Sequence, residues 1–149
     1  MSTTSTTPAG QPTTSDVLTR IEAPVAFLPA AEDTEVVFRH LDDEELDDLS
    51  DIATAMGVER VKPIRLGRNF ILHTDGDYSH QPPVFNAAAT LIVAATTHGP
   101  YSQPLRVHGP ALLTGTAGGH NRPLHDTEID SLIDLSTSIL PDTHITISD

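Results

Sequence analysis

The chain has 149 residues, 38% of them apolar, a length that suits one domain with one core. It carries 21 Asp and Glu against 8 Lys and Arg, and its formal net charge of −13 disfavours direct binding to nucleic acids or anionic membranes. The absence of cysteine excludes disulfides, thiolate catalysis and cysteine-ligated zinc. Because the sequence has neither a signal peptide nor an apolar run of about 20 residues, we expect a cytoplasmic protein without membrane segments.

The N-terminal region differs in composition from the rest of the chain. Residues 1–16 are mostly Ser, Thr, Pro, Gly and Gln, so ordering them would bury little apolar surface. We expect a disordered tail over residues 1–16 and a single domain over residues 17–149. Apolar and β-branched residues then predict strands at 24–29 and 35–41, which could pair as a hairpin.

Residues 42–56 show the clearest helical pattern. Leu46, Leu49, Ile52, Ala53 and Met56 recur at spacings of three and four, which places them on one face of a single helix. We expect Asp42 or Asp43 to cap this helix and Gly57 to end it in the left-handed conformation.

The middle of the chain predicts two more strands and a helix. Strands are expected at 58–64 and 70–74, followed by a hairpin turn at Asp75 and Gly76. Asn86 is placed to cap an apolar helix over 87–95, and a buried strand over 91–95 is the competing interpretation.

The last third predicts short strands at 105–107 and 111–114, a loop over 115–123 and a third helix. Thr127 and Asp130 resemble a capping box at the start of that helix, which should end before Pro141. Residues 144–147 alternate only weakly. Together these elements predict an α+β fold in which two or three helices pack on a mainly antiparallel sheet of four to six strands.

This order of elements resembles a family of short uncharacterised proteins common in actinobacterial phages, plasmids and their hosts. The residues that carry the resemblance are Gly57, Pro63, Asn86, Ala89-Thr90 and the segment Gly109 to Gly115, within residues 24–116. The loop at 96–103 is longer than in the family pattern. The resemblance implies a fold and an origin, and it implies no catalytic activity.

The chain has eight histidines, and because imidazole is a common metal ligand they raise the hypothesis of a metal site. The best local cluster is His73, Asp75, Asp77 and His80, in which a hairpin would bring the two histidines to one face. A third histidine would have to come from elsewhere in the fold. The alternative interpretation is that these are exposed loop histidines, and the spacing does not fit a calcium-binding loop.

Four carboxylates of the predicted helix share its polar face. Glu44, Asp47, Asp48 and Asp51 lie together opposite the apolar stripe when residues advance by about 100° each. Such a stripe could mimic phosphates and occupy the basic groove of a nucleic-acid-binding host protein. A solvated helix face is the alternative.

Binding is therefore the function that the sequence favours. We expect an accessory protein of a phage or mobile element, without a cofactor, that binds a basic host protein through its acidic helix. The alternative is a small metal-dependent hydrolase that uses the His73 cluster. The motifs of serine hydrolases, metalloprotease helices and kinases do not occur in the sequence.

Overall fold

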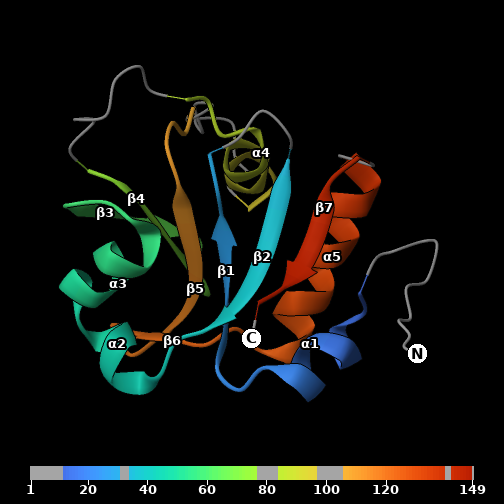
Figure 1. Cartoon of the computed structure of the whole chain (residues 1–149), viewed down its shortest axis with the longest axis horizontal. Coiled ribbons are helices and arrows are strands. Elements are labelled where there is room, and N and C mark those ends of the chain that lie inside the picture. The colour runs from blue at the N-terminus through green and yellow to red at the C-terminus, as the bar shows by residue number, and fades with distance from the viewer. Residues whose placement is uncertain (1–11, 31–33, 77–83, 97–105, 140–141, 149) are drawn as a thin grey trace.

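The computed structural model describes residues 12–30, 34–76, 84–96, 106–139 and 142–148 (Figure 1). Within these segments, seven strands form one open sheet and five helices pack against it. The predicted α+β class and the mainly antiparallel sheet are confirmed. The described part nevertheless holds more strands than the expected four to six and more helices than the expected two or three.

The sheet is antiparallel except at one edge. In spatial order its main strands are β3 (Val61–Leu66), β4 (Phe70–Asp75), β5 (Ala111–Ala117), β1 (Pro24–Leu28), β2 (Glu35–His40) and β7 (His144–Ile147). Only β2 and β7 run parallel, and the short β6 (His120–Arg122) pairs with the end of β5. The predicted pairing of the first two strands is confirmed by the antiparallel β1–β2 ladder.

Both faces of the sheet are covered by helices. Ala26 and Leu28 of β1 lie in a core with α1 (Thr14–Arg20), α4 (Ala87–Thr96) and α5 (Asp126–Ile139). Val25 and Phe27, which alternate with them, face a second core under α2 (Asp43–Asp47) and α3 (Leu49–Met56). This coverage explains why β1 is apolar throughout, since a strand buried on both faces does not alternate with polar residues. Figure 1 shows α2 and α3 at the end of the sheet near β3, with α1 and α5 at the end near β7.

An ordered helix begins inside the range that the sequence analysis assigned to the tail. Thr13 caps α1 by accepting a hydrogen bond from the Asp16 amide, and the Asp16 carboxylate accepts one from the Thr13 amide. Val17 is fully buried and holds this helix on the core. The Thr-x-x-Asp pattern of a capping box was the missed signal. Residues 1–11 lie outside the described segments.

The single helix predicted over 42–56 is instead two short helices. Asp48, at φ −118° and ψ 115°, interrupts it, and its side chain accepts a hydrogen bond of 2.8 Å from the Ser50 amide. An aspartate that offers its own oxygen to a nearby amide competes with the helical ladder and starts a new helix. The break turns Leu49 outward, where it is 47% exposed, so its predicted place in the buried stripe was wrong.

The remainder of the helical pattern is confirmed. Leu46, Ile52 and Met56 are buried in the second core, and Gly57 ends α3 at φ 76°. Asp42 caps α2 as expected and forms a capping box with Glu45.

Asn86 caps α4, so residues 87–96 form a helix and the competing strand interpretation was wrong. Its Oδ1 atom accepts the Ala89 amide at 3.0 Å, and its Nδ2 donates to the carbonyl oxygens of Leu28 and Gly109, both at 2.9 Å. The buried amide therefore ties the start of α4 to the end of β1 and to the turn before β5.

The loop predicted over 115–123 is a hairpin. β5 continues to Ala117 and returns as β6 through Gly118 and Gly119, at φ 59° and 84°. Two consecutive residues at positive φ form the tight turn that suits a two-residue hairpin, and glycine adopts this conformation without strain. Of the strand predicted at 105–107, the described residues 106 and 107 are not in a strand.

The remaining predicted elements differ mainly in their ends. β3 begins at Val61 and β4 extends to Asp75, whereas the hairpin predicted to follow Asp75 runs into residues 77–83, outside the described segments. Helix α5 begins at Asp126, one residue before the predicted capping box. Among the helices of the described segments, none combines the length and apolar character needed to cross a bilayer.

The α2–α3 break predicts opposite results for two neighbouring leucines. Leu46→Ala removes a fully buried side chain and should lower the free energy of unfolding by about 2 to 5 kcal/mol. Leu49→Ala removes an exposed side chain and should change it by less than about 1 kcal/mol. Urea denaturation of both variants checks this, and equal losses would show that residues 42–56 form one continuous helix.

Candidate functional site

The predicted acidic stripe is an exposed surface on two helices. Residues 42–51 hold seven of the chain's carboxylates, and residues 41–58 contain no Lys or Arg. The surface consists of Glu44 and Asp47 on α2, Asp48 at the break, and Leu49 and Asp51 on α3, all of them exposed. We call these five residues the acidic α2–α3 surface.

The break changes how these carboxylates are presented. The predicted single helix face does not exist, because Asp48 is the cap of α3 and its carboxylate is engaged with the Ser50 amide. The same break leaves the side chain of Leu49 exposed, and in the sequence Leu49 stands between Asp48 and Asp51. An exposed apolar side chain with charged neighbours is a feature of interaction surfaces, in which the apolar group becomes the buried anchor and the charges form the rim.

The β6 strand supports this surface from the sheet side. The Asn121 side-chain amide donates a hydrogen bond of 2.8 Å to the Leu46 carbonyl oxygen near the end of α2. His120 Nδ1 lies 3.8 Å from Asp47 Oδ1, but both side chains are well exposed, so this contact adds little stability. The hairpin therefore fixes the C-terminal end of α2 mainly through Asn121.

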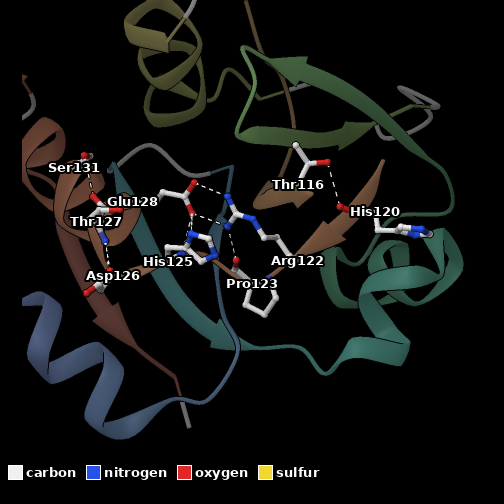
Figure 2. A network of polar contacts seen from close by, with 9 residues as sticks. All are labelled: Thr116, His120, Arg122, Pro123, His125, Asp126, Thr127, Glu128 and Ser131. Carbon is white, nitrogen blue, oxygen red and sulfur yellow. Dashed lines mark hydrogen bonds and ion pairs between the residues drawn. The ribbon is translucent and has the colours of Figure 1, made fainter. Parts of the chain in front are cut away.

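An ion pair holds β6 itself in place (Figure 2). Arg122 forms a two-point contact with Glu128 of α5, with Nη1 2.7 Å from Oε1 and Nη2 2.8 Å from Oε2. Nη1 also donates to the Pro123 carbonyl oxygen at 2.8 Å. The two side chains are only 17% and 10% exposed, and such paired, hydrogen-bonded charges are costly to separate.

The pKa of Glu128 reflects two opposing effects. Burial of the carboxylate raises the pKa, whereas the hydrogen bonds from Arg122 and from the His125 amide lower it. The hydrogen bonds win, and the pKa of Glu128 lies below its ordinary value. The carboxylate is therefore charged at neutral pH, and the ion pair is intact.

Glycine at position 115 makes room for this pair. Gly115 lies opposite Arg122 in the β5–β6 ladder, and a Cβ atom there would overlap the guanidinium group. Any larger residue would push Arg122 away from Glu128. The backbone of β5, the guanidinium of β6 and the carboxylate of α5 thus form one interlocked unit.

The structure describes two of the four proposed metal ligands. His73 and Asp75 both lie buried on β4, two residues apart and hence on the same face of the strand. Asp77 and His80 lie outside the described segments. Within those segments, no group of three or more potential ligands comes together.

His73 is a core residue, so the interpretation of this histidine as an exposed loop residue was wrong. Its ring is fully buried, and Nε2 lies 3.1 Å from Thr114 Oγ1 on the neighbouring strand. Its Nδ1 atom has no hydrogen-bond partner among the described residues. Burial lowers the pKa of His73 to about 4, so the ring is neutral at physiological pH.

Comparison with known proteins gives no relative. No protein-family model matches the chain, and neither a similar curated protein nor a similar solved structure was found.

Sequence reasoning found the four carboxylates but missed what shapes and supports their surface. The exposure of Leu49 depends on the Asp48 cap, for which the run Asp47-Asp48 followed by Ser50 was the available signal. The support from Asn121 had one indirect signal, the Gly118-Gly119 pair, which predicts a hairpin and would have placed β6 on the sheet.

The buried His73 ring predicts a pH-dependent stability. Its pKa is near 6.5 in the unfolded chain and about 4 in the folded protein, so the unfolded state binds the proton first as the pH falls. Stability should be unaffected by this group above pH 6.5 and should fall between pH 6.5 and 4, with a loss of about 2 to 3 kcal/mol by pH 4.5.

Urea denaturation at pH 7 and pH 4.5 measures this loss in the wild type and in His73→Gln. The glutamine variant cannot take up the proton, so its loss should be smaller than the wild-type loss by the amount that His73 contributes. Equal losses in the two proteins would show that His73 is not buried as a neutral ring.

The Gly115 position gives a second test, by a double-mutant cycle. Gly115→Ala should cost about 1 to 3 kcal/mol in the wild type, because the added methyl group forces Arg122 off Glu128. In an Arg122→Ala background the methyl group meets no guanidinium, and the same substitution should cost much less. Chemical denaturation of the four proteins gives the coupling energy, and a coupling near zero would place the cost elsewhere.

Proposed function

We propose that this protein acts by binding a basic partner protein through the acidic α2–α3 surface. The observation that carries the proposal is the helix break at Asp48, which leaves Leu49 47% exposed among exposed carboxylates. A continuous helix would have buried this leucine. The fold instead presents an apolar anchor inside an acidic rim.

The chemistry of the partner follows from this surface. A complementary site has an apolar pocket for Leu49 rimmed by Lys or Arg side chains that pair with Glu44, Asp47 and Asp51. The basic groove of a nucleic-acid-binding protein has this character, because it is built to accept phosphates. In keeping with the family resemblance, we propose an accessory protein of a phage or mobile element, with a host partner in the cytoplasm.

The metal-dependent hydrolase has less support. His73, its first proposed ligand, has no exposed surface, and its Nε2 atom is engaged with Thr114. Its partner on the strand, Asp75, is 5% exposed. Two ligands buried to this extent leave a bound ion little exposed to a substrate.

The test compares two variants with equal changes in charge. The first neutralises the surface through Glu44→Gln, Asp47→Asn, Asp48→Asn and Asp51→Asn, and asparagine at position 48 can still cap α3. The control neutralises four exposed carboxylates elsewhere, at Glu22, Asp126, Asp134 and Asp142. Both variants have a formal net charge of −9 in place of −13 and should fold, because exposed charges contribute little to stability.

The partner is first identified by affinity capture with the wild-type protein, and its dissociation constant is then measured for all three proteins by calorimetry. We expect the surface variant to bind at least about tenfold more weakly and the control to bind within about threefold of wild type. Leu49→Ala should weaken binding while leaving the fold intact. If the surface variant and the control bind equally well, the surface is only a solvated face.

A further inference from the structure

The chain's few cations are concentrated at one place. Of the 8 Lys and Arg residues, four lie within residues 60–68, and all four are exposed: Arg60, Lys62, Arg65 and Arg68. They flank and occupy β3, the edge strand next to β4. We call them the basic β3 edge.

These cations have no carboxylate partners within the described segments. Arg65 Nε donates to the Gly67 carbonyl oxygen at 3.2 Å, but none of the four forms an ion pair with another described residue. Arg122, by contrast, is fully paired with Glu128. Along β3, Lys62 shares one sheet face with Ile64 and Leu66, and Arg65 shares the α2–α3 face with Val61, so the cations line the edge from both faces. Unpaired among the described residues, they leave this edge available to an anionic group from outside.

Pro63 makes the outer edge of β3 a poor site for the addition of another strand. The Gly76 amide donates to the Arg60 carbonyl oxygen, which makes these two residues a hydrogen-bonded pair of the antiparallel ladder. Alternation along the ladder then turns the nitrogen of Pro63 outward, to the open side of β3. A proline there donates no hydrogen bond to an added strand, which weakens backbone pairing at this edge and favours recognition by side chains.

The basic edge and the acidic α2–α3 surface lie at the same end of the molecule. Val61 of β3 packs on the core formed by Ile52 and Met56 of α3, and Figure 1 shows α2, α3 and β3 together at that end of the sheet. Two adjacent patches of opposite sign are complementary to the same pair of patches rotated by 180°, as an interface between identical subunits requires.

We propose that a second copy of this chain docks here, with the basic β3 edge of each copy facing the acidic α2–α3 surface of the other across a two-fold axis. Leu49, exposed in the acidic half, supplies an apolar contact in each half of the interface. A polyanion such as DNA matches only the basic half and is repelled by the seven carboxylates of residues 42–51.

The net charge of −13 makes two copies repel each other, but most of this repulsion comes from charges that lie far from the interface. At an ionic strength of about 0.15 M the screening length is about 8 Å, so charges on the far sides of the two copies hardly interact. Opposed charges in contact are screened much less. The dimer does not depend on the proposed function, since it needs no other protein.

The experiment uses two complementary variants of the full chain. The lysine variant carries Glu44→Lys, Asp47→Lys and Asp51→Lys, and the glutamate variant carries Arg60→Glu, Lys62→Glu and Arg68→Glu. Each lysine substitution adds two charges and each glutamate substitution removes two, so the formal net charges are −7 and −19. An equimolar mixture of the variants has the same average net charge as the wild type.

Sedimentation equilibrium at up to about 1 mM protein and 0.15 M salt measures the association. We expect the wild-type protein, with a chain mass of 15.9 kDa, to form a dimer that weakens at 1 M salt. Each variant alone should associate at least about tenfold more weakly, because like charges then face each other, and the mixture should associate about as well as wild type. Circular dichroism confirms that both variants fold.

The lysine variant separates this proposal from a simple effect of net charge. Its net charge of −7 is smaller in magnitude than the −13 of the wild type. If overall repulsion determined the strength of association, this variant would therefore associate more strongly than the wild type. A monomeric wild type, or a mixture that stays monomeric, overturns the proposal. So does a monomeric wild type that binds a DNA oligonucleotide and loses this binding in the glutamate variant, because the edge would then be a nucleic-acid site.

Discussion

The ion pair between Arg122 and Glu128 is the interaction on which the position of β6 depends. It joins β6 to α5, and it exists only because Gly115 leaves room for the guanidinium on β5. From β6, Asn121 extends the connection to the Leu46 carbonyl oxygen of α2. The position of the acidic surface at one end of the sheet therefore depends in part on a mostly buried ion pair on the opposite face. Loss of either charge would leave the other mostly buried without a counter-charge, which costs more than the pair itself contributes.

The two faces of the sheet are covered by helical layers of different size, and the proposed binding surface lies on the smaller one. Helices α1, α4 and α5 bury a large core that includes Phe38 and Ile129. Among the described segments, the opposite face is covered by the short helices α2 and α3, and it contains buried polar groups such as His73 and Thr114. Short helices have little stability of their own and depend on packing and caps. In this thinner layer, the helix ends and the capping residues Asp42 and Asp48 lie at the protein surface, and the other carboxylates of α2 and α3 surround them.

The sequence predicted elements well where a local signal agreed with the packing, as in β1, β2 and the α4 helix capped by Asn86. It failed where two local signals competed. The apolar spacing over residues 42–56 predicts one helix, but the capping preference of Asp48 divides it, and spacing alone cannot show which preference wins. His73 could not be located from sequence either, because its burial results from the pairing of β4 with β5. The contact of Arg122 with Glu128 spans a turn between a strand and a helix, so no periodic pattern marks it.

The proposed dimer and the proposed binding of a basic partner both use the carboxylates of the acidic α2–α3 surface, so the two compete. A basic partner of the acidic α2–α3 surface must displace the basic β3 edge of the second copy, so its apparent affinity falls as the dimer becomes more populated. When the second copy leaves, the remaining copy's own basic β3 edge is uncovered, and its Arg60, Lys62, Arg65 and Arg68 lie beside the bound partner. These cations repel the basic groups that surround the partner's binding site, which restricts the orientations in which the partner can dock. Placing both signs of charge at one end of the sheet thus limits self-association and partner choice together, because any ligand of one patch must also be compatible with the other.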